Sequence, residues 1–480
     1  MTRASKWLAL DLRSLGLLRI CIAFCLLVDL FFRSFHLVAH YTSQGFLPLR
    51  NYISLPHITE RHWSLFFLGD SPFLVTLLFL LYATFALGLL LGIRTRLCGW
   101  LCWAFLLSLY HRNPNIANSG DSYLLAILFW GNFLPWGRFF SCQGKTEKSD
   151  SEETYHQSMA GAFLVFQVMF LYMFAVVTRT GVEWQVDHSA LYYSLHLEHF
   201  ETWVGNQVGA LDSRVLGLMT QLVSYGEFFG PLFLLVPSAR VRTVCVAALV
   251  SFHLGLGASL YIPNFALAAM LTPLGLLPSA VWETRLGGRL NGFLSRLSER
   301  VGHRLPPRLI RSGSKSPAGF ESVYQMLPIP AMALVIFCLF WRITDHTLIP
   351  PLAPVADLFG LNQRWDMFSP YPPHESNWIQ AKGLTQSGRL VELRTGGDYQ
   401  ESPQQSRDDV FLRDFRNYAF EYRLRGEASS LYLQGLVQRW DRSHPNDPVV
   451  VAELVAFQAT TPSENVLPEY GREVWEVYRR

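Results

Sequence analysis

The sequence carries few charges for its length. Only 16% of its 480 residues are charged, whereas 50% are hydrophobic. The apolar residues gather in nine runs, and about 20 apolar residues suffice to cross the roughly 30 Å hydrocarbon core of a bilayer. This composition predicts a mainly α-helical, polytopic membrane protein with about nine transmembrane helices. The predicted spans cover residues 12–33, 72–93, 97–111, 121–140, 159–178, 216–237, 243–260, 262–281 and 326–343.

Three further features are missing from the sequence. It has no internal repeat, which gives no support to a transporter built from inverted repeats. No predicted span carries charges at the regular spacing of a pore lining, so a channel is the least supported function. No small-residue cleavage site follows the first apolar run, and we expect that run to stay in the protein as its first span.

Basic residues predict on which side of the membrane each loop lies. The segment 282–325 holds eight Arg or Lys residues and fewer acids, and the turns 92–96 and 238–242 are also basic. The segment 345–480 instead holds more acids than basic residues. Because Lys and Arg beside spans stay in the cytoplasm, we predict an N-terminus inside, nine spans and a C-terminus outside. We expect the bacterial inner (cytoplasmic) membrane as the location.

Cysteine is absent from every part that we predict to be exported, which also suits a bacterial inner membrane. Structural disulfides are therefore not expected. The seven cysteines fall in predicted spans or on the predicted cytoplasmic side: Cys21, Cys25, Cys98, Cys102, Cys142, Cys245 and Cys338.

These signals predict four parts along the chain. The parts are a transmembrane bundle (1–282), a basic cytoplasmic amphipathic segment (283–325), a last transmembrane helix (326–345) and a small extracytoplasmic α+β domain (346–480). In the last part, the stretches 389–395 and 449–460 have strand-like composition. They flank helical patterns at 408–424 and 427–440.

The basic segment has two distinct faces. Its arginines recur at spacings of four or seven residues: Arg285, Arg289, Arg296, Arg300 and Arg304. Its apolar residues share another face of the same helix: Leu286, Leu290, Phe293, Leu297 and Val301. This pattern indicates an amphipathic helix on an anionic lipid leaflet, so membrane lipids are expected partners. A nucleic acid is the weaker alternative and is not predicted as a partner.

Ionisable residues at membrane depth are the best site candidates, because each is costly unless it is paired or faces a polar cavity. Glu227 and His253 lie in adjacent predicted spans. A carboxylate and an imidazole on neighbouring spans can form a hydrogen-bonded pair that handles protons, although a lone buried histidine is usually structural. Asp29 and Arg33 lie one turn apart, and an ion pair near the outer interface accounts for them.

A polar break separates two of the apolar runs. Residues 111–121 have the sequence HRNPNIANSGD. Something outside the lipid must use or satisfy these polar groups. His111, Asn118 and Asp121 are therefore candidate site residues.

The order of several motifs resembles a known membrane family. GIRTR, RNPNIANSGD, LFWGNFLPWGRFFS, YGEFFGP, SFHLGLGASLYIPNF and LTPLGLLPSAVW follow one another along the chain. Together they resemble the HTTM domain shared by the vitamin K-dependent gamma-carboxylase and its bacterial relatives, over roughly residues 10–282. The later RWDMFSPYPPHESNW resembles a sequence that many bacterial members carry after their last span.

The resemblance implies a site in the bundle where a reduced quinone is oxygenated to a base that removes a substrate proton. His253 matches a family histidine, and Asp121 stands where the carboxylase has histidine and most bacterial members have Asp. The family lysine that starts the chemistry lies five residues before a tryptophan, here Trp184, so Arg179 occupies its position. A guanidinium, with a pKa above about 12, stays charged and cannot act as that base. A true gamma-glutamyl carboxylase is therefore not expected.

Two functions remain open from the sequence. The first is a carboxylase-like or epoxidase-like enzyme that binds a quinol or another isoprenoid lipid and couples its redox chemistry to modification of a substrate. The second is a non-catalytic binding or maturation factor for an exported peptide or protein client. For the enzyme, the catalytic candidates are His253, Glu227 and Asp121, and the substrate-binding candidates are Arg179, His111, Asn118 and Trp184. No metal is predicted.

Overall fold

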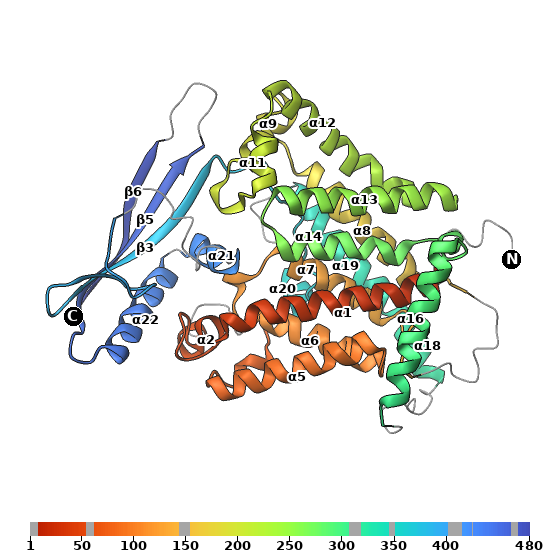
Figure 1. Ribbon diagram of the computed structural model, residues 1–480, viewed down its shortest axis with the longest axis horizontal. Helices are drawn as coiled ribbons and strands as arrows, with labels where there is room; N and C mark the ends of the chain where they lie inside the picture. The colour runs from red at the N-terminus through yellow and green to blue at the C-terminus, as the bar shows by residue number, and fades with distance from the viewer. Residues whose placement is uncertain are drawn as a thin grey trace.

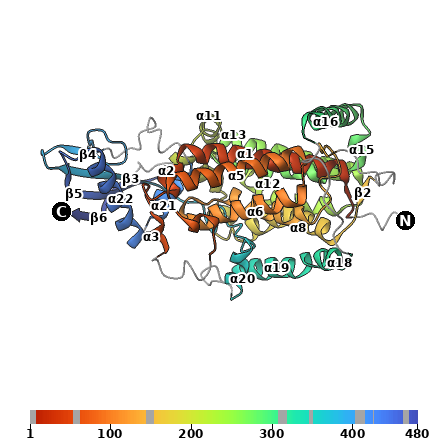
Figure 2. The same cartoon turned by 90° about the horizontal axis from the view of Figure 1, so that it is seen from below.

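A long helical bundle occupies most of the molecule, with a β-sheet at one end and a crossing helix at the other (Figure 1). Figure 2 shows the same order from a perpendicular direction, with the sheet and the helix α16 at opposite ends. The computed structural model describes residues 8–53, 62–143, 154–306, 318–344, 351–401, 415–424, 426–461 and 469–480.

Helices occupy the positions of all nine predicted spans. They are α1 (Leu12–Phe35), α5 (Pro72–Leu91), α6 (Thr95–Arg112), α7 (Ser119–Asn132), α8 (Met159–Val177), α12 (Ser213–Phe229), α13 (Ala239–Ser259), α14 (Pro263–Leu271) and α19 (Pro328–Thr344). Among the described residues, five helical segments are long and apolar enough to cross a membrane: α1, α5, α8, α13 and Glu321–Thr344, which contains α19. A nine-span arrangement remains a prediction.

Proline shortens two of the predicted spans. The helix α12 gives way to the 3-10 helix η5 (Gly230–Leu235) at Pro231, and α14 gives way to η6 (Thr272–Leu276) at Pro273. Proline lacks the N–H of a helical ladder and clashes with the carbonyl four residues earlier, so an α-helix cannot continue unchanged through it. The span predicted at 121–140 is likewise too long, because α7 ends at Asn132 and a run of turns precedes Ser141.

Local sequence signals fix the ends of α5. The Ser71 side chain accepts a hydrogen bond from the Leu74 N–H, and Pro72 occupies the first turn, where its missing N–H costs nothing. At the other end Gly92 adopts a left-handed conformation with φ of 75°, which glycine reaches without strain.

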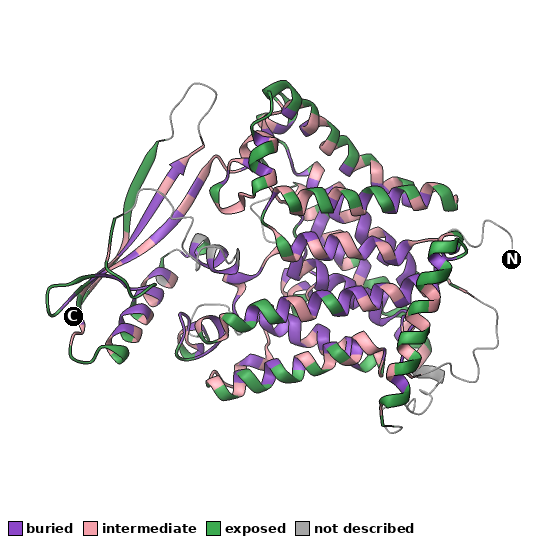
Figure 3. Ribbon diagram, in the orientation of Figure 1, coloured by how far each residue is buried: buried purple, intermediate pink, exposed green. Residues whose placement is uncertain are grey.

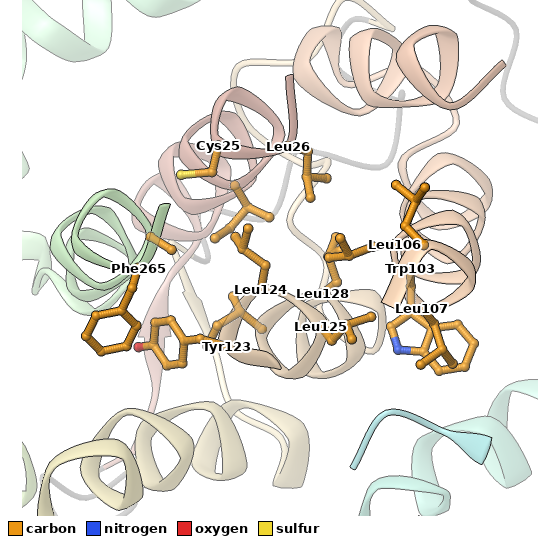
Figure 4. Close-up of a cluster of buried hydrophobic side chains, with 14 of the residues drawn as sticks. Cys25, Leu26, Trp103, Leu106, Leu107, Tyr123, Leu124, Leu125, Leu128 and Phe265 are labelled. Carbon is orange, nitrogen blue, oxygen red and sulfur yellow. The ribbon is translucent and has the colours of Figure 1, made fainter. Parts of the chain in front are cut away.

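The hydrophobic core runs through the middle of the bundle, whereas large parts of α12 and α13 face outward (Figure 3). Figure 4 shows where Leu26 of α1, Leu106 of α6 and Leu124 and Leu128 of α7 meet. All four side chains are fully buried. In a lipid environment such side chains stabilise the bundle by close van der Waals packing rather than by removal from water.

Short elements connect the long helices. They are β1 (Leu10–Asp11), α2 (Leu37–Tyr41), α3 (Leu49–Ile53), η2 (Leu65–Leu68), η3 (Pro114–Ile116), β2 (Tyr155–His156), α9 (Val182–Gln185), α10 (Ala190–Leu195), η4 (Glu198–Phe200), α11 (Trp203–Gly209), α15 (Ser279–Trp282) and α18 (Ala318–Met326).

The basic segment forms the helix α16 (Arg285–Arg304), which crosses one end of the bundle (Figure 1). Its apolar residues Leu286, Leu290, Phe293 and Leu297 are exposed in the isolated chain. The predicted amphipathic helix is therefore confirmed. Residues 307–317 of the segment lie outside the described part of the chain.

The C-terminal part contains an antiparallel sheet in the order β4-β3-β5-β6. Its elements are α20 (Ala353–Leu358), β3 (Glu375–Thr385), β4 (Leu390–Glu392), α21 (Phe415–Arg423), α22 (Glu427–Ser443), β5 (Val449–Thr460) and β6 (Tyr470–Arg479). The strand predicted at 449–460 matches β5, whereas only three residues of the stretch 389–395 form β4. The sequence prediction missed β3 and β6. The predicted helical residues 408–414 lie outside the described part.

Candidate functional site

A cavity of about 440 Å³ lies between α8, α12, α13 and the C-terminal part of the chain. Most of its wall is apolar, contributed by residues such as Leu256 and Phe265. Five of the seven predicted site residues line it: Asn118, Arg179, Trp184, Glu227 and His253. Asp121 and His111 are not part of this wall.

Arg179 and Glu227 form a buried ion pair in the cavity wall. Arg179 follows the end of α8, and its Nη1 donates to Oε2 of Glu227 on α12. The guanidinium also lies over the Trp184 ring, 4.2 Å from its centroid. Trp184 is fixed in turn, because its Nε1 donates to the Phe368 carbonyl over 2.9 Å. Nε of Arg179 is buried and has no hydrogen-bond partner among the described residues.

His253 forms a second polar pair in the same wall. Its Nε2 lies 2.9 Å from the hydroxyl of Tyr172 on α8. The imidazole is 2% exposed, and the ring of Phe265 meets it edge-on. Within the described part of the chain, the buried Nδ1 has no hydrogen-bond partner. A neutral imidazole has one donor and one acceptor nitrogen. Nδ1 is therefore an acceptor if Nε2 donates to Tyr172, and a donor if Nε2 accepts from Tyr172.

The predicted hydrogen bond between Glu227 and His253 is wrong. Both residues border the cavity, but the Glu227 carboxylate binds Arg179 and the His253 imidazole binds Tyr172. A guanidinium within reach is the stronger partner for a carboxylate, because the interaction is a charge-assisted hydrogen bond. The site therefore contains two separate polar pairs.

Asp121 belongs to a buried charge cluster. Arg33 donates to Asp29 and to Asp121, each over 2.7 Å, and Arg416 of α21 also binds both carboxylates. Two carboxylates and two guanidinium groups balance one another, so Asp121 has a structural environment, and its catalytic role remains a prediction. The predicted Asp29–Arg33 pair is confirmed as one edge of this larger cluster.

The cluster nevertheless touches the cavity through two asparagines. The Asn118 side chain and Asp121 form a reciprocal capping box at the start of α7, and Asn264 Nδ2 donates to Asp121 over 3.1 Å. Both asparagines line the cavity. Asp121 thus fixes residues of the wall without facing the cavity itself.

His111 lies outside the cavity, at the end of α6. Its Nδ1 is 2.8 Å from the Trp63 carbonyl, and its ring stacks on His62 with centroids 4.6 Å apart. These contacts describe a packed histidine away from the cavity wall, and the predicted role of His111 in substrate binding remains untested.

Sequence reasoning missed part of the wall. Tyr172 lies within an apolar run and gave no signal of its own. The RWDMFSPYPP stretch was noted only for its resemblance, yet it supplies Met367, Phe368 and Tyr371 to the wall. Its Pro370 carbonyl accepts from the Gly181 N–H over 2.8 Å, which holds the stretch against the segment that carries Arg179.

No family model, no curated protein and no solved structure matches this chain. The resemblance to the HTTM domain therefore rests on the ordered sequence motifs. Among the described residues, no group of three or more His, Cys, Asp or Glu side chains is arranged to hold a metal ion.

Proposed function

We propose that this chain is a multi-pass membrane protein of the HTTM type that binds a quinol or another isoprenoid lipid. It couples the redox chemistry of that lipid to the modification of a substrate and is not a gamma-glutamyl carboxylase. The observation that carries this proposal is the presence of two buried polar pairs, Arg179–Glu227 and His253–Tyr172, in one largely apolar cavity.

The residues present fit a planar head with oxygen acceptors. Ligand sites are typically apolar cavities of about 300–1,000 Å³ with a few placed polar groups, and a volume of about 440 Å³ falls in that range. Arg179 Nε and His253 Nδ1 are buried without partners in the described structure, and buried polar groups are normally satisfied. When bound, a quinone head would supply two-electron redox chemistry.

The two pairs have different roles at the site. Glu227 and Trp184 hold the Arg179 guanidinium in place, so a fixed positive charge and a hydrogen-bond donor are available to a ligand oxygen. Tyr172 fixes the orientation of His253, whose Nδ1 accepts or donates a proton at the ligand. The apolar wall keeps bulk water away from both.

Organic extraction of the purified protein, followed by mass spectrometry, tests the proposal. We expect a stoichiometric quinone or isoprenoid lipid in wild-type protein and its loss in His253→Ala. His303→Ala is the matched control, since His303 is exposed on α16, and it should retain the lipid. Bulk phospholipid alone in all three preparations would contradict the proposal.

The second candidate function is a binding or maturation factor for an exported client. Arg179 in place of the family lysine supports it, as does the exposure of β6, where Val474 and Val477 face solvent. Edge strands of this kind bind extended peptides by strand addition. Photoreactive residues at these two positions should capture a client in native membranes; capture of nothing from either position would count against this function.

A further inference from the structure

A second hollow opens beside the cavity. It is a groove of about 690 Å³ lined by α12, η5 and α13, with Tyr172 of α8 also in its wall. Figure 1 shows α12 running obliquely to α13, and the two helices splay apart with distance from η5. The outward faces of both helices are largely exposed in Figure 3.

The groove adjoins the cavity. Four residues border both spaces: Tyr172, Val223, Glu227 and Phe252. Glu227 is the partner of Arg179, and Tyr172 is the partner of His253. One member of each polar pair, Glu227 or Tyr172, therefore lies in the wall that the groove and the cavity share.

The lining of the groove is largely apolar. Apart from Tyr172, Glu227 and Arg240, its lining side chains are apolar. Leu222, Phe233 and Val244 are more than half exposed in the isolated chain, at 62%, 53% and 68%. Exposed apolar surface of this extent is typical of a contact with lipid or with an apolar ligand.

We propose that this groove holds the hydrocarbon chain of a lipid whose polar head lies in the cavity beside Arg179 and His253. The inference rests on the proposed function for the cavity and adds the position of the chain and a lateral route from the bilayer between α12 and α13. A chain gains little by leaving lipid for an equally apolar groove. The groove instead lets the head reach the polar pairs while the chain remains in apolar surroundings.

Two glycines in the lining allow a direct test. A Cβ built at Gly226 or at Gly230 meets no atom within 4 Å, so a larger side chain extends into open space. Gly226→Leu should therefore obstruct the groove without disturbing the bundle, and leucine is also a better helix former than glycine. Gly255 is the matched control, because it too has open space around its Cβ and lies on α13 but lines neither hollow.

The experiment uses the full chain in nanodiscs and two probes. One probe is menadione, which has no chain, and the other is menadione with a four-unit prenyl chain that carries a photoreactive diazirine at its far end. In wild type and Gly255→Leu, we expect the diazirine to label peptides from 222–252, and menadione to compete with the labelling. In Gly226→Leu, labelling by the prenylated probe should fall about tenfold, because added bulk in an apolar site is poorly tolerated.

Binding of menadione itself, measured by equilibrium dialysis, should be unchanged in Gly226→Leu. Two results would overturn the proposed position of the chain and leave the proposed function standing. One is labelling of 222–252 that stays intact in Gly226→Leu. The other is labelling confined to other helices while menadione still binds. Absence of menadione binding to wild type would instead overturn the proposed function together with the inference.

Discussion

At the residue scale, the Arg179–Glu227 pair is stabilised by mutual neutralisation in a buried wall. Replacing one partner leaves the other as an uncompensated buried charge, which typically costs about 3–5 kcal/mol. We expect Arg179→Met and Glu227→Gln each to lower the thermal stability of the detergent-solubilised protein. The double variant should lose less than the sum of the two, because removing the second partner also removes the unpaired charge.

An exposed ion pair provides the control for this double-mutant cycle. Arg389 and Asp398 form a pair in the C-terminal part, with side chains 56% and 74% exposed. Pairs in water add little to stability, so Arg389→Met should leave the melting temperature nearly unchanged. Additive losses in the Arg179 and Glu227 variants would show that the two residues do not act as a pair.

His199, in the cavity wall, gives a pH dependence with a defined sign. Loss of hydration lowers the pKa of its imidazole to about 3, whereas an unfolded chain protonates histidine near pH 6.5. Below about pH 6.5 the unfolded state therefore binds a proton that the native state does not, and native stability falls. We expect the melting temperature to drop between about pH 7.5 and 5.5, and less steeply in His199→Gln. Equal slopes in the two proteins would show that His199 is not held neutral.

At the element scale, the sequence predicted helices most accurately where one local signal is enough to define the helix. Long apolar runs located α1, α5, α8, α13 and α19. Spans that contain proline were predicted too long, because hydropathy does not register the missing N–H at Pro231 and Pro273. The strands β3 and β6 were missed, since β6 is an edge strand with little buried surface and both mix polar with apolar residues.

The candidate site was predictable only in part, and for a related reason. Rare ionisable groups within apolar runs identified Glu227 and His253, both of which line the cavity. Their partners come from distant segments: Arg179 is 48 residues from Glu227, and Tyr172 is 81 from His253. The charge cluster around Asp121 was not predicted, because its partner Arg416 is 295 residues away and no local pattern links the two.

The helix α21 depends on that distant contact. It lies between the sheet and the bundle in Figure 1, and its Arg416 reaches Asp29 and Asp121. Arg416→Met would leave two buried carboxylates with Arg33 alone, at a cost of about 3–5 kcal/mol. We expect α21 to become cleavable by trypsin at Arg423 and the melting temperature to fall.

Two variants sharpen this prediction for α21. Arg416→Lys should rescue little, because an ammonium lacks the fork that bridges two carboxylates. Arg472→Met removes an exposed pair with Glu401 and should leave both protease resistance and melting unchanged. Wild-type resistance in Arg416→Met would mean that the charge cluster does not hold the C-terminal part against the bundle.

At the scale of the whole molecule, α16 and the C-terminal sheet lie at opposite ends of the bundle (Figure 2). That separation suits a basic helix on one leaflet and an α+β domain across the membrane, as the charge pattern predicts. A topology with nine spans and a topology with five spans both place α16 inside and the C-terminal sheet outside, because each number of spans is odd. The two topologies differ in the short helices, and the turn between α12 and α13 distinguishes them.

Labelling of single cysteines with a membrane-impermeant maleimide in intact cells separates the two topologies. The native cysteines give little background, because all seven are buried. Ser387→Cys in the C-terminal part should react from outside, and Arg300→Cys on α16 only after permeabilisation. Ala239→Cys, exposed at the start of α13, is decisive: nine spans place it inside, whereas five spans place it outside. Protection of Ala239→Cys in intact cells would make α12 a span, because one more crossing then follows α8 before α13 begins, and with Arg300→Cys inside it would make α14 a span as well. Its reaction from outside would leave α12 on the outer side of the bilayer and remove the lateral route between α12 and α13.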